Sequence, residues 1–85
     1  MAQDVVVYTT DPCSFCTRAK KLLDARGIEY EEINLARDPA GRQELVDKTG
    51  MMSFPQVIVK GELVGGFTET AAADKSGELA RMLAA

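Results

Sequence analysis

The run VVVYTTDPCSFCTRAKKLL, residues 5–23, places two cysteines between two different hydrophobic patterns. Residues 4–9 form a nearly continuous β-branched and aromatic run, which is typical of a buried strand. Residues 14–26 carry apolar side chains at helical spacing, which predicts an amphipathic helix. Cys13 and Cys16 therefore lie where a buried strand turns into a helix.

The rest of the chain predicts the remaining elements of one small α/β unit. In order we expect a strand at 29–35, a helix from Asp38-Pro39 to Gly50, strands at 56–60 and 62–65 around a Lys60-Gly61 turn, a helix at 68–73, and a last turn or two at 77–83 with Ser76 as N-cap. A strand–helix–strand start implies a parallel crossover, and the hairpin adds two antiparallel strands. We expect a four-stranded mixed sheet with helices on both faces.

Length and charge restrict the function classes. The chain has 85 residues, which allows one domain, residues 1–85, with one modest core. The net charge of −3 argues against nucleic-acid and anionic-membrane partners, which favour basic patches. No apolar run is long enough to span a bilayer, and the first residues do not resemble a secretory signal. We therefore expect a cytoplasmic protein.

The two cysteines are the chemical feature of the sequence. The chain has no histidine, which excludes Ser-His-Asp triads and Cys-His nucleophiles. A disulfide between Cys13 and Cys16 would close a loop of four residues, which stabilises a fold by only about 2 kcal/mol. Two cysteines alone also cannot complete a four-ligand metal site. A CxxC pair in a cytosolic protein therefore indicates redox or metal chemistry.

The two thiols are not equivalent. Cys13 precedes the predicted helix, where unpaired N–H groups and the helix dipole favour a thiolate. Cys16 lies in phase with Ala19 and Leu23, on the buried face. We expect Cys13 to be the accessible nucleophile and Cys16 the resolving thiol. The alternative is two ordinary half-buried cysteines.

Two further motifs are weaker when taken alone. Ser53-Phe54-Pro55 precedes a predicted strand, either as a cis-proline that presents the backbone of Phe54 or as an ordinary proline at a strand start. The segment 65–69, Gly-Gly-Phe-Thr-Glu, can hold an anion at a helix N-terminus. Its alternative is a flexible turn with Thr68 as N-cap.

Together these motifs resemble the glutaredoxin family. VYTTDPCSFCTRAKKLL, the proline before QVIV, and ELVGGFTE are similar in order and spacing to small bacterial glutaredoxins over nearly the whole chain. The resemblance implies the thioredoxin fold and the reduction of disulfides and glutathione–protein mixed disulfides. It also implies glutathione as co-substrate and electron donor, no tightly bound cofactor, and a monomer.

The resemblance assigns roles residue by residue. Cys13 would accept the glutathionyl group, and Cys16 would resolve the intermediate. The residues implied to contact glutathione are Thr10, Phe15, Ser53, Phe54, Pro55, Gly66, Phe67, Thr68 and Glu69.

Departures from the family pattern leave alternatives open. Ser14 stands where the family usually has proline. A serine at this position resembles relatives that hold a [2Fe–2S] cluster between two subunits. There the first cysteine (here Cys13) and glutathione are the cluster ligands. Thr10, Met51 and Met52 are neutral where relatives often carry cations that meet a glutathione carboxylate, and Lys20 and Arg37 are candidate substitutes. A third hypothesis is a thioredoxin-like electron donor to a reductase such as ribonucleotide reductase, reduced by a flavoprotein.

Overall fold

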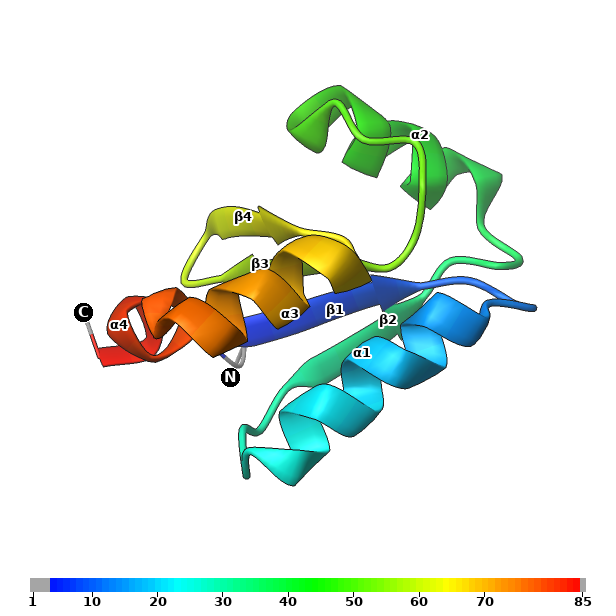
Figure 1. The fold of residues 1–85 in the computed structure, drawn as a ribbon. Helices are drawn as coiled ribbons and strands as arrows, with labels where there is room; N and C mark the ends of the chain where they lie inside the picture. The colour runs from blue at the N-terminus through cyan, green and yellow to red at the C-terminus, as the bar shows by residue number, and fades with distance from the viewer. Residues whose placement is uncertain (1–3, 85) are drawn as a thin grey trace.

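The computed structural model describes residues 4–84, which form one four-stranded sheet and four helices (Figure 1). In chain order the elements are β1 (Val5–Thr9), α1 (Ser14–Ala25), β2 (Glu31–Asn34), α2 (Pro39–Thr49), β3 (Gln56–Val59), β4 (Glu62–Gly65), α3 (Phe67–Ser76) and α4 (Glu78–Ala84). Within residues 4–84 no helix has the length and apolar character needed to cross a membrane.

The sheet is mixed, as predicted. Its strand order is β2-β1-β3-β4, with β1 parallel to β2 and antiparallel to β3. The hairpin of β3 and β4 turns at Lys60 and Gly61, whose φ angles of 50° and 83° are both left-handed. Two central residues with positive φ match the twist of the adjoining strands. The predicted hairpin is confirmed.

Helices cover both faces of the sheet. On one face, the buried side chains of Val5 and Val7 belong to a core cluster with Leu23 of α1 and Leu79 of α4. The intervening side chains of β1 point the other way, where Leu45 is the buried residue of α2. Figure 1 shows α2 separated by the sheet from α1 and α3. The α/β arrangement expected from the sequence is therefore present.

The first two helices begin and end close to the predicted positions. Cys13 is the N-cap of α1, and Gly27 follows the helix with a φ of 68°. The Asp38 carboxylate caps α2 by accepting from the N–H of Gly41 at 2.8 Å. Gly50 ends α2 in the left-handed conformation that favours glycine.

The largest departure concerns the C-terminal helices. The third helix runs over Phe67–Ser76, beyond the predicted 68–73, and α4 covers Glu78–Ala84. Ser76 is the last residue of α3 and not an N-cap, because Gly77 follows it with a φ of 87° and ends that helix. The Ser76 hydroxyl still accepts from the N–H of Glu78, at 3.3 Å.

The second strand is shorter than the predicted 29–35. The ladder with β1 pairs Glu31–Asn34, so Tyr30 and Leu35 lie outside it. Leu35 is nevertheless buried, and its N–H donates to the carbonyl of Thr9 at 2.9 Å. The imperfect alternation of this segment reflects a strand with exposed charged residues, a half-buried Tyr30 before it and a buried Leu35 after it.

Candidate active site

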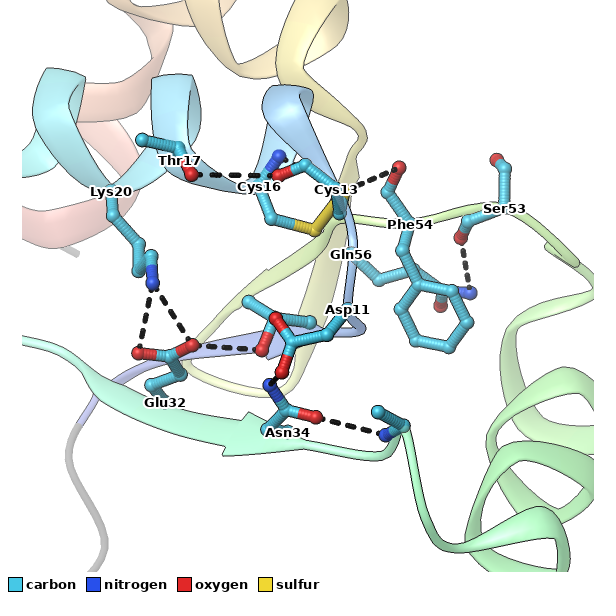
Figure 2. Close-up of a disulfide and its surroundings, with 12 residues drawn as sticks. Asp11, Cys13, Cys16, Thr17, Lys20, Glu32, Asn34, Ser53, Phe54 and Gln56 are labelled. Carbon is cyan, nitrogen blue, oxygen red and sulfur yellow. Dashed lines mark hydrogen bonds and ion pairs between the residues drawn. A yellow bond between two sulfur atoms is a disulfide. The ribbon is translucent and has the colours of Figure 1, made fainter.

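Cys13 and Cys16 form a disulfide at the N-terminus of α1 (Figure 2). Cys13 has an extended backbone, and its Sγ accepts a hydrogen bond from the N–H of Cys16 at 3.1 Å. Cys13 is half-buried, whereas Cys16 is only 2% exposed. The helical phase thus gave the correct order of burial, and a helix N-terminus favours a thiolate at Cys13 in the dithiol form.

The Phe54-Pro55 peptide bond lies beside the disulfide and is cis, which is the first of the two interpretations of this motif. The carbonyl oxygen of Phe54 lies 3.8 Å from Cys13 Sγ (Figure 2). Pro55 is fully buried at the start of β3, while Ser53 is exposed and Phe54 half-buried. A second cis bond, Asp11-Pro12, leads into the CxxC turn and was not predicted.

Gly65 and Gly66 precede α3 and lie against the side chain of Glu69. Gly66 is the N-cap, and its N–H donates to the Glu69 carboxylate at 2.7 Å. Gly65 has a φ of 129°, and a Cβ there would lie 2.8 Å from the Cβ of Glu69. Thr68 is therefore inside the helix, so the alternative with Thr68 as N-cap is wrong. Glycine followed three residues later by glutamate could have predicted the backbone bond to Glu69.

An aromatic pair links α1 to α3 beside the cysteines. The rings of Phe15 and Phe67 are stacked, with centroids 6.1 Å apart and planes 29° apart. Phe15 is 50% exposed, and the Arg18 guanidinium lies 5.3 Å from its centroid. The sequence reasoning missed Arg18, although residues three apart on a helix are neighbours.

Residues predicted from three separate motifs share one cavity of about 210 Å³. Of the nine side chains or backbone positions implied to contact glutathione, eight line it, and Thr10 does not. The lining residues are Phe15, Ser53, Phe54, Pro55, Gly66, Phe67, Thr68 and Glu69. Larger hollows lie elsewhere, such as one of about 560 Å³ around Asp24 and Tyr30. Neither cysteine lines the 210 Å³ cavity, but Phe54, whose carbonyl oxygen is 3.8 Å from Cys13 Sγ, does.

The cations around the site are mostly engaged. Lys20, a candidate for the glutathione carboxylate, pairs with Glu32 at 3.1 Å, and Glu32 also accepts from the Thr9 hydroxyl at 2.8 Å (Figure 2). Arg37 is exposed. Met52 is 82% exposed, so this loop presents a thioether to solvent and no charge. Across residues 4–84 no group of three or more His, Cys, Asp or Glu side chains is arranged to hold a metal ion.

Comparison with known sequences identifies relatives over nearly the full length of the chain. The family model described as Glutaredoxin matches residues 5–64. A glutaredoxin of Pseudomonas aeruginosa is 38% identical over 81 residues, which cover 95% of this chain and 96% of that protein. Glutaredoxin 3 of Escherichia coli K12 is 31% identical over 80 residues, covering 94% and 96%.

Solved structures agree with this relationship. A buckwheat glutaredoxin–glutathione complex superposes with a TM-score of 0.87 at 30% identity, over 96% of this chain and 77% of that one. The solution structure of glutaredoxin from Brucella melitensis gives a TM-score of 0.83 at 35% identity, over 96% and 89%. The predicted thioredoxin fold is confirmed. With its cysteine pair at the start of α1, the chain belongs to the glutaredoxin family of thiol–disulfide oxidoreductases.

Proposed function

We propose that the protein uses glutathione to reduce disulfides and glutathione–protein mixed disulfides, with Cys13 as the nucleophile. The observation that carries this proposal is the position of Cys13, half-buried at the N-terminus of α1 and 3.8 Å from the carbonyl oxygen that precedes cis-Pro55. Membership of the glutaredoxin family and the likeness to a glutaredoxin–glutathione complex support it.

With a glutathione mixed disulfide, the reaction needs one thiol of the protein. The Cys13 thiolate attacks the glutathione sulfur, the old S–S bond breaks, and the substrate leaves as a thiolate that takes up a proton. The thiolate of a second glutathione then attacks the glutathione sulfur of the Cys13–glutathione mixed disulfide. Glutathione disulfide leaves, and the Cys13 thiolate is regenerated.

With a protein disulfide, both cysteines take part. Cys13 attacks one substrate sulfur, and Cys16 then attacks Cys13 Sγ in the mixed disulfide, which releases the reduced substrate. The product is the Cys13–Cys16 disulfide, the bond seen in the structure. Two glutathione molecules return it to the dithiol and become glutathione disulfide.

The cavity beside Cys13 is the proposed glutathione site. The backbone of the bound glutathione would run along Ser53 and Phe54, next to the reacting sulfur of Cys13. Its γ-glutamyl end would lie over Gly66 and Thr68, where the N-terminus of α3 favours a carboxylate. The stacked ring of Phe15 would cover the side of the cavity formed by α1.

The decisive experiment compares two reducing systems. Turnover of the mixed disulfide of glutathione and 2-mercaptoethanol is followed through NADPH oxidation, with glutathione and its reductase or with thioredoxin reductase alone. The proposal predicts turnover with glutathione and little with thioredoxin reductase. The reverse result favours the thioredoxin-like hypothesis and contradicts the proposal.

The proposal places the protein in the cytoplasm as a monomer. Size-exclusion chromatography with light scattering checks the mass of the free protein in solution. Cell fractionation with an antibody against the protein checks its location. A stable dimer of the cluster-free protein, or its recovery in a membrane or secreted fraction, contradicts these parts of the proposal.

A further inference from the structure

Gln56 is a fully buried polar residue directly after cis-Pro55. Its Nε2 donates to the carbonyl of Met51 at 2.9 Å. It also donates to the carbonyl of Ser53 at 3.1 Å (Figure 2). Its Oε1 accepts from the Thr49 hydroxyl at 2.8 Å. Burial of an amide is costly unless it is paired, and here one end of the amide is paired with the loop and the other with the last residue of α2.

These bonds connect the loop at residues 50–54 to rigid elements on both sides. The backbone of Gln56 is in register with Tyr8 of the central strand β1. Thr49 ends α2, and its hydroxyl also accepts from the N–H of Met51 at 3.1 Å. The side chains of Thr49 and Gln56 therefore hold the loop between α2 and the sheet.

The anchored loop carries one wall of the proposed glutathione site. Ser53 and Phe54 line the cavity, and the Phe54 carbonyl is the oxygen beside Cys13 Sγ. Met52 lies between the two anchored carbonyls and is 82% exposed, so it adds little packing of its own. The Gln56 bonds thus determine where this part of the backbone lies relative to the cysteine.

We propose that Gln56, supported by Thr49, is a positioning residue that holds the Ser53–Phe54 backbone in register with Cys13 for the incoming thiol peptide. The inference rests on the proposed function, because it assigns this backbone to the bound substrate. It predicts that loss of the amide weakens substrate binding and leaves the thiolate of Cys13 unchanged. The thiolate is stabilised separately, by the N–H of Cys16 and the start of α1.

The first test replaces the amide with an apolar group of similar size. Gln56→Leu removes all three bonds and leaves the Met51 and Ser53 carbonyls unpaired. We expect the KM for the glutathione mixed disulfide to rise about fivefold or more, with kcat changed less than about twofold. The rate and pH profile of Cys13 alkylation by iodoacetamide should match wild type. Gln43→Leu is the control, since Gln43 is an exposed glutamine of α2 whose amide donates to Asp47.

A second pair of variants decides the matter if Gln56→Leu does not fold. Thr49→Val keeps the shape of the side chain but loses the hydroxyl that meets Gln56 and Met51 and that also lies 3.0 Å from the Leu45 carbonyl. Thr49→Ser keeps that hydroxyl. We expect Thr49→Val to raise the KM in the same way and Thr49→Ser to stay close to wild type.

Gln56→Glu adds a pH signature. A carboxylate cannot donate to the two carbonyl oxygens, and its burial among them raises its pKa. The neutral acid can donate one hydrogen bond, so the KM of this variant relative to wild type should increase with pH between about 5 and 8. A purely apolar packing role of Gln56 would give no such slope.

Amide hydrogen exchange of Met51, Ser53 and Phe54 tests the anchoring without turnover. Gln56→Leu and Thr49→Val should exchange faster there than wild type and Gln43→Leu. The inference is overturned if exchange and KM both stay at wild-type values, or if kcat and the alkylation rate fall together with binding. Wild-type protein that shows no turnover with glutathione overturns the proposed function instead, and the two failures are therefore distinguishable.

Discussion

The N–H of Cys16 donates to the Sγ of Cys13 at 3.1 Å, while the side chain of Cys16 lies almost fully inside the protein. The same helical turn therefore stabilises negative charge on the first sulfur and covers the second. This arrangement assigns different steps to the two thiols, since only Cys13 is open to an external disulfide.

Single cysteine variants separate these steps. Cys13→Ser should abolish all thiol transfer, because a serine hydroxyl is not ionised at neutral pH. Cys16→Ser should keep or raise activity on glutathione mixed disulfides, since a second glutathione resolves the intermediate. It should lose most activity on protein disulfides. Alkylation and mass mapping of the reduced protein at mildly acidic pH should label Cys13 first, and preferential labelling of Cys16 would contradict the assignment.

A cation added at position 10 should strengthen glutathione binding. Thr10 lies in the turn between β1 and the CxxC segment, and Met52 adds no charge in the loop before cis-Pro55. Thr10→Lys should lower the apparent KM for glutathione by about two- to fivefold, as expected for a solvent-screened ion pair. Gln43→Lys adds the same charge on the outside of α2 and should have no effect. An unchanged KM in Thr10→Lys would mean that another cation already meets the carboxylate.

Glu69 has a capping role that can be separated from a ligand role. Glu69→Ala removes the bond to the Gly66 N–H and should lower the free energy of unfolding by about 1 kcal/mol in denaturant titrations. Glu69→Gln keeps an oxygen acceptor and should retain most of that stability. If the carboxylate also meets the γ-glutamyl ammonium, Glu69→Gln should still raise the KM for glutathione. Glu62→Gln, on the exposed face of β4, controls for net charge.

The sequence predicted which residues gather around one cavity better than it predicted some element boundaries, and the roles of these residues toward glutathione stay predictions. The burial of Cys16 could be predicted from its helical phase with Ala19 and Leu23. The residues that line the cavity could be predicted from three motifs whose order matched a known family. The sequence alone could not show that Lys20 is paired with Glu32, because partners distant in the chain are brought together by tertiary packing.

Local signals also competed within the chain. Ser76 has the residue type of an N-cap, but the left-handed Gly77 after it decides where α3 ends. In the sequence, Gln56 belongs to a strand motif and carries no functional signal. Its side chain is buried and paired only because the loop at residues 50–54 folds back against it. A buried polar residue of this kind can be recognised only when the positions of all its hydrogen-bond partners are known.

The cluster hypothesis remains a prediction that Ser14 can test. Ser14 is the first residue of α1, a position where proline fits without loss of a helical hydrogen bond, so Ser14→Pro should fold. A [2Fe–2S] cluster takes four ligands, and each chain would offer Cys13 and one bound glutathione. Anaerobic reconstitution with iron, sulfide and glutathione should give a visible chromophore and a dimer, both weaker in Ser14→Pro. A colourless wild-type monomer contradicts the hypothesis.

The ion pair between Arg26 and Asp74 should make stability depend on acid pH. Arg26 follows α1 and donates two hydrogen bonds, at 2.9 and 2.8 Å, to the Asp74 carboxylate of α3. The hydrogen bond from the guanidinium lowers the pKa of Asp74 below its usual value. A depressed carboxyl pKa stabilises the fold above the unfolded value of about 3.9, and this contribution is lost as the pH falls through the folded pKa.

Asp74→Asn should therefore lower the melting temperature at pH 7, and the difference from wild type should shrink as the pH falls below about 4. Glu78→Gln is the matched control, because Arg81 also lowers the pKa of Glu78 but both residues belong to α4. We expect a smaller effect from this control, because the Glu78–Arg81 ion pair lies within one helix and does not connect α4 to another helix. The measurement is thermal unfolding by circular dichroism at constant ionic strength. A difference between Asp74→Asn and wild type that is the same at pH 2 and pH 7 would show that the ion pair does not stabilise the contact between α1 and α3.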